Sequence, residues 1–168
     1  QSTITYTAGA ASKYIVTSSS SSPVAGATVT ISAQLADAND NPVATSGQTV
    51  TWTKSNANGS FATATSTTNA SGIATVVFTT HTVVATATTV TATTSAISGT
   101  SATITTVAAT ASKYIVTSSS SSPAAGGTVT ISAQLADANN NPVSTSGQSV
   151  TWTKSDANGS FATATSTT

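Results

Sequence analysis

The stretch Thr28-Val-Thr-Ile-Ser-Ala-Gln-Leu-Ala36 decides the fold, because apolar and polar residues alternate through it without a break. One face of this stretch would carry Val29, Ile31, Ala33 and Leu35. A period of two is typical of a β-strand that is buried on one face and exposed to solvent on the other. The same alternation returns at 48–54, where Val50 and Trp52 stand between threonines. Both stretches therefore predict strands that cover a common core.

Turn-forming clusters separate five further stretches of strand-like composition from these two. Asn and Asp close local turns and Pro fixes its own φ angle, so clusters such as Asp37–Pro42 and Asn56–Gly59 end strands. The expected turn at Ser95–Gly99 separates the last two strands, and the last strand would point Ala102 and Ile104 inward. The predicted strands are Lys13–Thr17, Thr28–Ala36, Gln48–Lys54, Phe61–Thr65, Ile73–Thr79, Thr86–Thr94 and Thr100–Val107. Short strands with frequent turns and no helical period predict an all-β fold, an antiparallel β-sandwich.

The sequence also repeats itself, because residues 11–68 return as residues 111–168 with a period of 100. The six differences between the copies are Val24 to Ala124, Ala27 to Gly127, Asp40 to Asn140, Ala44 to Ser144, Thr49 to Ser149 and Asn56 to Asp156. A unit of this length is the size of an independent domain, so the pattern indicates tandem domains. We predict the last strand of a preceding repeat at 1–10, a complete repeat at 11–110 and the N-terminal part of a second repeat at 111–168.

The composition excludes several classes of function. The chain has four basic and four acidic residues and a net charge of zero, so it has no basic surface for nucleic acid. No apolar run is long enough to cross a bilayer. Cys is absent, which excludes disulfides and thiolate metal sites. The single histidine, His81, has no acidic residue near it in the sequence, so no Ser–His–acid set can be assembled and we expect neither an enzyme nor a cofactor.

Five motif blocks carry a family resemblance, and they follow one another in the order Gln34–Val43, Gly47–Trp52, Asn58–Phe61, Ser71–Ala74 and Val90–Ala92. This arrangement resembles the bacterial Ig-like domains of the invasin/intimin group. The resemblance implies tandem Ig-like β-sandwiches that act as spacers in long surface proteins, often adhesins. The chain departs from the group in its low charge and its high Thr content, and it lacks the lectin-like tip domain with which intimins and invasins bind receptors.

The loop 37–41 is a candidate calcium site. Asp37, Asn39 and Asp40 offer the carboxylate and amide oxygens that calcium prefers, and the loop is similar to a calcium element of cadherins. The same residues also suit an Asx turn without a metal, and the second copy has Asn at position 140. Asn58, Asn69 and Asn158 begin N-glycosylation acceptor sequences, which coincide with predicted turns, so either reading fits them.

The two ends of the sequence look complementary. Thr3, Ile4, Thr5, Tyr6 and Thr7 align with the last strand of the repeat, since Thr3–Thr5 matches Thr103–Thr105. The partial copy would leave the core residues Val129, Ile131, Leu135, Trp152 and Phe161 without their covering strands. Strand addition to an open sheet is a known mode of recognition. We therefore hypothesise that 3–7 of one molecule completes 111–168 of the next; the alternative is one continuous polypeptide with many repeats.

Three functions are compatible with these features, all of them extracellular or at a cell surface. The first is a structural repeat module of a filament, stalk or giant surface protein, whose partners are other copies of the module. The second is an adhesin repeat that binds carbohydrate or host protein, and the third is an Ig-like decoration domain of a virion or tail fibre. Near-identical copies favour the structural function, because an array needs repetition whereas a binding site needs singular residues.

Overall fold

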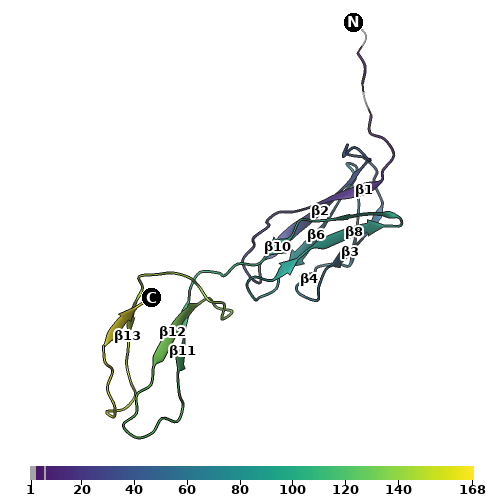
Figure 1. Ribbon diagram of the computed structural model, residues 1–168. Helices are drawn as coiled ribbons and strands as arrows, with labels where there is room; N and C mark the ends of the chain where they lie inside the picture. Colours follow the sequence, from purple (N-terminus) through teal and green to yellow (C-terminus); the bar gives the residue numbers. More distant parts are fainter. Residues whose placement is uncertain (1–2, 6) are drawn as a thin grey trace. The chain divides into compact units, whose positions relative to one another are not determined.

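The computed structural model describes residues 3–5 and 7–168, and the chain divides into two compact units. Unit 1 comprises Gln1–Val107 and unit 2 comprises Ala108–Thr168. Every regular element in the described residues is a β-strand, which confirms the predicted all-β fold class (Figure 1).

Unit 1 is a sandwich of two four-stranded antiparallel sheets with the orders β1-β2-β6-β4 and β5-β3-β8-β9. The first sheet consists of β1 (Lys13–Ser18), β2 (Thr28–Ala36), β6 (Ile73–Thr79) and β4 (Ser60–Phe61). The second consists of β5 (Thr65–Thr67), β3 (Thr49–Lys54), β8 (Val90–Thr94) and β9 (Ile97–Thr100). A short ladder joins β7 (Ala87–Thr88) to β10 (Ile104–Thr105).

The core of unit 1 is formed by alternate residues of both sheets, as the period of two predicts. Ile31 from β2, Phe78 from β6 and Trp52 from β3 belong to one buried cluster. Trp52 is only 4% exposed, and its indole Nε1 donates a hydrogen bond to Ser66 Oγ at 2.9 Å. Burying a large apolar side chain stabilises a fold by about 1.5–3 kcal/mol. The predicted burial of Trp52 beside Ile31 and Phe78 is confirmed.

Two predicted strands are wrong because the chain changes sheets inside them. The stretch predicted as Phe61–Thr65 is two strands: Phe61 in β4 pairs with Phe78, and β5 starts at Thr65 and pairs with β3. Between them the Ala62 N–H still bonds to β6, whereas the Ala64 carbonyl already accepts from the Trp52 N–H. The stretch predicted as Thr86–Thr94 is likewise divided into β7 and β8.

The last predicted strand and the turn before it also need correction. β9 starts at Ile97, inside the expected turn, because Ser95 takes a positive φ of 48° and closes a two-residue hairpin between Thr94 and Ile97. Ala102 is exposed rather than inward, whereas Ile104 is buried as predicted. Ser101 is buried in this region, and its hydroxyl accepts a hydrogen bond from the Val90 N–H at 3.0 Å.

Unit 2 contains four strands that correspond to β1, β2, β3 and β5. They are β11 (Lys113–Ser118), β12 (Ile131–Ala136), β13 (Ser149–Thr151) and β14 (Thr165–Thr167). The ladder of β11 with β12 has the register of β1 with β2, since Lys113 pairs with Ala136 as Lys13 pairs with Ala36. The residues 108–168 contain no counterparts of β6, β8 and β9.

Equivalent glycines report this difference in packing. Gly59 and Gly159 have nearly the same positive φ, 68° and 66°. A Cβ on Gly59 would lie 2.5 Å from both the Phe78 ring and the Thr79 carbonyl oxygen, whereas a Cβ on Gly159 would meet nothing within 4 Å. At Gly59 both the positive φ angle and the neighbouring residues of β6 disfavour a side chain. At Gly159 only the positive φ angle does.

We predict that Gly59→Ala lowers the unfolding free energy of its unit more than Gly159→Ala does. Both variants place an alanine in a left-handed conformation, which costs about 1–2 kcal/mol. Only Gly59→Ala also forces a methyl group against β6, and overpacking adds about 1–3 kcal/mol. Urea unfolding followed by the tryptophan of each unit, with the other tryptophan replaced by Phe, measures both values. Equal losses would show that Phe78 does not pack against Gly59.

Candidate functional site

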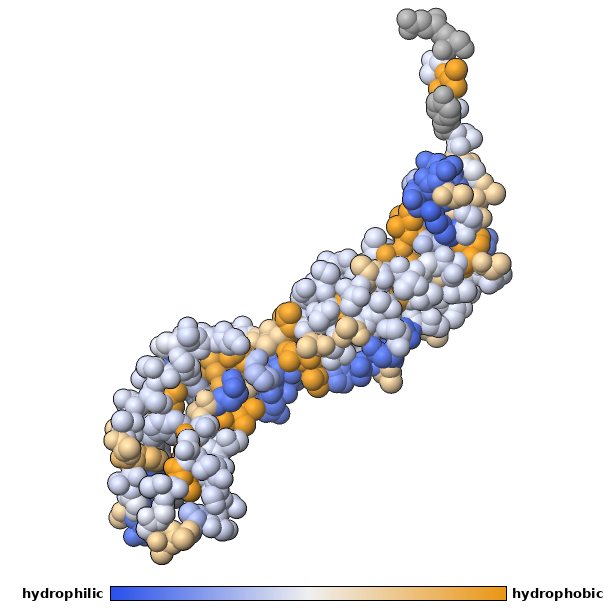
Figure 2. All heavy atoms as spheres, in the orientation of Figure 1, coloured by the Kyte–Doolittle hydropathy of each residue, from blue (hydrophilic) through white to orange (hydrophobic). Residues whose placement is uncertain are grey.

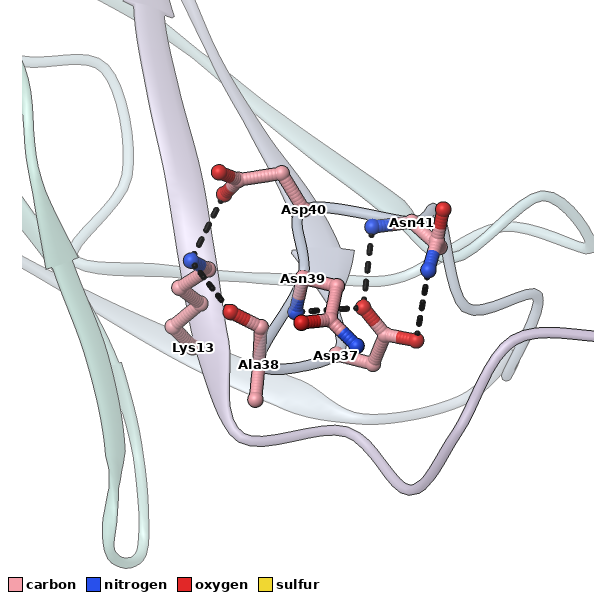
Figure 3. A network of polar contacts seen from close by, with 6 residues as sticks. All are labelled: Lys13, Asp37, Ala38, Asn39, Asp40 and Asn41. Carbon is pink, nitrogen blue, oxygen red and sulfur yellow. Dashed lines mark hydrogen bonds and ion pairs between the residues drawn. The ribbon is translucent and has the colours of Figure 1, made fainter.

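The loop after β2 is organised around one carboxylate, that of Asp37. Its Oδ1 accepts hydrogen bonds from the backbone N–H groups of Asn39 and Asn41, both at 2.9 Å. Its Oδ2 accepts from the Asn41 Nδ2 at 3.0 Å and from the Gly9 N–H at 2.8 Å. Figure 3 shows the bonds within the loop. Asp37 is 4% exposed, so these donors replace the water that an exposed carboxylate would bind.

These donors lower the pKa of Asp37 from its ordinary value of 3.8 to about 2. The largest cause is the side-chain amide of Asn41, followed by the Gly9 N–H, since both stabilise the charged form. Asp137 has the same environment in unit 2, and its pKa is also lowered to about 2. There the N–H of Ala109 donates to Oδ2 at 3.0 Å, in the place of Gly9. Each carboxylate thus binds a backbone N–H of the segment that precedes the first strand of its unit.

The three calcium candidates lie in one loop, but the carboxylates of two of them, Asp37 and Asp40, already have partners. Both Asp37 oxygens accept two hydrogen bonds each, and the Asp40 carboxylate lies 2.7 Å from Lys13 Nζ. The same Nζ donates to the Ala38 carbonyl oxygen at 3.2 Å (Figure 3). The ammonium group of Lys13 therefore already neutralises the Asp40 carboxylate. Within residues 3–5 and 7–168, no group of three or more His, Cys, Asp or Glu could hold a metal ion. This geometry favours the Asx turn.

The glycosylation candidates lie at turns. The Asn69 Oδ1 accepts hydrogen bonds from the N–H groups of Ser71 and Ile73, which makes Asn69 the centre of an Asx turn. Asn69 and Asn158 are exposed and Asn58 is half-buried. Modification of these residues stays a prediction.

The proposed assembly strand pairs with no other strand through its described residues, 3–5 and 7. Thr3, Ile4, Thr5 and Thr7 are exposed and belong to no ladder, while Tyr6 lies outside the described residues. Ile4 is 75% exposed, which is unusual for an isoleucine.

The second expected feature, the uncovered core of unit 2, contains Val129, Ile131, Leu135, Trp152 and Phe161. Val129 and Phe161 are exposed, and the other three are half-buried. Their counterparts in unit 1 are Val29, Ile31, Leu35 and Trp52, which are buried, and Phe61, which is half-buried. The Trp152 and Phe161 rings contact each other with centroids 6.4 Å apart. An apolar cavity of about 350 Å³ opens beside Trp152.

Sequence reasoning missed the role of the lead-in segments. The bonds from Gly9 to Asp37 and from Ala109 to Asp137 each join residues 28 positions apart through a backbone N–H. A backbone donor leaves no mark on residue type, so no sequence signal could have identified it. Buried hydroxyls were missed as well. Thr68 is 4% exposed, and its Oγ1 accepts from the Gln48 N–H and donates to the Thr45 carbonyl oxygen.

Comparisons with known proteins concern the fold. No protein-family model matches the sequence, and no curated protein matches it. Among solved structures, the chain is similar to the adhesin FdeC of Escherichia coli, with 16% identity, a TM-score of 0.55, and coverage of 84% of this chain and 46% of that chain. It is also similar to the adhesin InvE of Yersinia pseudotuberculosis, with 18% identity, a TM-score of 0.52, and coverage of 82% and 44%. The fold is that of bacterial Ig-like domains.

The Ig-like fold is not confined to adhesins. A glycosyl hydrolase family 2 member from Bacteroides cellulosilyticus matches 60% of this chain with 15% of its own, at 17% identity and a TM-score of 0.53. The chain spans less than half the length of both adhesin structures. No helix long and apolar enough to cross a membrane occurs in the part of the chain that the structure describes.

The lowered pKa of Asp37 predicts how acid affects unit 1. A carboxyl whose folded pKa is depressed stabilises the fold above its unfolded pKa, and this contribution is lost as the pH falls through the folded pKa. The unfolding free energy should therefore stay level down to about pH 4 and fall between pH 4 and 2. Urea unfolding followed by Trp52 fluorescence in a Trp152→Phe background measures this dependence.

Two variants distinguish the contribution of Asp37 to the acid dependence from that of Asp40. Asp37→Asn should remove most of the decline and destabilise the unit at neutral pH, because an amide nitrogen would face the donors of Gly9 and Asn41. Asp40→Asn should keep the decline, since Asp40 is exposed and its ion pair with Lys13 contributes little. An unchanged acid decline in Asp37→Asn would contradict the assignment.

Calcium should leave the loop unchanged. We expect millimolar CaCl₂ to produce no shift of the Asn39 and Asn41 amide signals in ¹H–¹⁵N spectra, because the carboxylate oxygens of Asp37 are already occupied. Saturable shifts confined to this loop, absent with MgCl₂, would show a calcium site.

Proposed function

We propose that the chain is a structural module of an extracellular filament, stalk or large cell-surface protein, and that it associates end to end with further copies of the same module. The observation that carries the proposal is the connection between the two units. Val107 is the last anchored residue of unit 1, since its N–H donates to the Pro23 carbonyl oxygen at 3.0 Å. Ala109 is the first anchored residue of unit 2, through Asp137. One residue, Ala108, separates the two anchors, which suits modules in series rather than domains on a long flexible linker.

Surface chemistry supports a passive, extracellular role. Figure 2 shows a mostly pale face, which agrees with a sequence rich in Ser and Thr and poor in charged residues. Such a surface offers no charged field to attract nucleic acid. The likeness in fold to two bacterial adhesins supports a location at a cell surface.

The arrangement of polar groups supports a function without catalysis. His81 Nδ1 accepts a hydrogen bond from the Val83 N–H at 3.1 Å, so this ring nitrogen is engaged in its own loop. The carboxylates of Asp37 and Asp137 each accept three hydrogen bonds within their own loop and a fourth from the segment before the first strand.

A second candidate, an adhesin module that binds carbohydrate or protein, is favoured by one observation. Phe161 is 38% exposed and lies beside the half-buried Trp152, and exposed aromatic pairs are common in binding surfaces. The structural function ranks first because the equivalent residues in unit 1 serve the core: Trp52 belongs to it and Phe61 packs against it.

Immunogold electron microscopy with an antibody against unit 1 tests the structural proposal. We expect label outside the producing cells, repeated along filaments or across the surface. Label confined to the cell interior would overturn the proposal. A glycan array probed with the chain and with Trp152→Ala tests the adhesin candidate, and specific binding that Trp152→Ala abolishes would favour it over a purely structural module.

A further inference from the structure

Two segments of unit 1, residues 13–25 (the first segment) and residues 97–107 (the last segment), run side by side in the same direction. Their pairing is parallel, with a bridge between Val24 and Val107. Three backbone hydrogen bonds join them: Thr105 N–H to the Ser21 carbonyl oxygen at 2.9 Å, Val107 N–H to the Pro23 carbonyl oxygen at 3.0 Å, and Ala25 N–H to the Val107 carbonyl oxygen at 2.9 Å.

The contact extends back to the start of both segments. The backbones of Tyr14 and Gly99 lie so close that a Cβ on Gly99 would overlap the Tyr14 carbonyl oxygen. The Tyr14 hydroxyl forms a hydrogen bond of 2.8 Å with the hydroxyl of Thr94, just before the last segment. Val16 and Ile104, both buried, line one cavity of about 220 Å³. The two segments therefore stay together from β1 to the end of the unit.

The chain enters unit 1 just before the first segment and leaves it directly after the last segment. Gly9, whose N–H binds Asp37, is the entry contact, and Val107 is the exit contact. Figure 1 shows β1 towards the end of unit 1 at which the chain enters and β10 towards the end at which it leaves. Tension on the chain therefore pulls the first segment backward along its axis and the last segment forward.

Tension in these directions shears the bonds between the two segments. Backbone hydrogen bonds between strands lie across the strand axis, so a pull along the axis displaces donor and acceptor sideways. All three bonds then carry the load together and must break nearly at once. A pull that separates the segments at one end would instead break the bonds one after another, each under the full load.

We propose that the first and last segments form a mechanical clamp through which unit 1 carries tension along the chain. The first segment belongs to one sheet, because β1 pairs with β2, and the last segment belongs to the other, because β9 pairs with β8. The clamp thus joins the two sheets, and unfolding under tension begins when it breaks. This inference goes beyond the proposed function and rests on it in one respect, namely that neighbouring parts of a filament or surface protein pull on the module.

Two pulling directions on the full chain test the clamp. The natural chain has no cysteine, so cysteine pairs attach handles for optical tweezers at chosen exposed positions. Ala8→Cys with Thr110→Cys loads unit 1 along both segments. Thr28→Cys with Thr110→Cys loads it across the end at which both segments stop, since position 28 follows the first segment by three residues. Unit 2 lies outside the loaded stretch in both chains.

We expect unit 1 to survive at least about tenfold longer along the segments than across their end at the same constant force, because lifetimes under force follow the barrier to unfolding. Equal lifetimes, or longer survival across the end, would overturn the clamp.

A variant of the clamp and a matched control test which bonds form the barrier. Val107→Pro removes the N–H that binds the Pro23 carbonyl oxygen, so the lifetime along the segments should fall about tenfold. Thr68→Ala removes two hydrogen bonds of a buried hydroxyl that contacts neither segment. It should lower the unfolding free energy in urea but change the lifetime under load less than about threefold, because those bonds are still intact when the clamp breaks.

Equal shortening of the lifetime by both variants would also overturn the clamp, since the barrier under load would then follow overall stability. If Val107→Pro does not fold, the comparison of the two pulling directions decides alone, because it leaves the residues of the clamp unchanged. Both measurements use the purified chain, so their failure would leave the proposed extracellular role standing, and the immunogold experiment tests that role separately.

Discussion

The structure depends on a constraint of β-sandwiches, namely that the apolar face of each sheet needs the other sheet as its cover. In unit 1, β6 extends the first sheet while β8 and β9 complete the second, so that Ile31 and Trp52 leave water. In unit 2, β11 and β12 keep the same register, yet Ile131 and Trp152 stay half-buried. Nearly the same amino-acid sequence thus has two different burials, and the difference comes from the covering strands alone.

The alternation of apolar and polar residues predicts the bounds of a strand correctly where that strand stays within one sheet. The predicted bounds Thr28–Ala36 and Ile73–Thr79 agree with β2 and β6, because both strands alternate along their full length and pair with each other. It failed at 61–65 and 86–94, where the chain crosses between sheets. Such a crossing depends on which neighbour offers the next hydrogen bond, and that neighbour lies far away in the sequence.

The sequence predicts that residues 37–41 form a polar turn, but it does not predict all of the hydrogen bonds to Asp37. The composition of Asp37–Asn41 predicts a turn, and the Asp37 carboxylate does accept the N–H groups of Asn39 and Asn41. The fourth donor, the Gly9 N–H, comes from the segment before β1. Through this bond the loop also binds the segment that precedes the first strand. The same bond recurs between Ala109 and Asp137, so it tolerates a change of side chain at the donor residue.

The scarcity of charge also affects how the strand edges of this fold are protected. Natural proteins protect exposed strand edges with lysines, prolines or inward-pointing charges that repel another strand. The outward residues of β12 are Ser132 and Gln134, which are uncharged. The single lysine of β11, Lys113, has its Nζ bonded to the Ala138 carbonyl oxygen at 3.0 Å. In unit 1 the equivalent edge of β2 is paired with β6, so the uncharged outward residues of β12 suit a strand whose edge is paired rather than one that repels a neighbour.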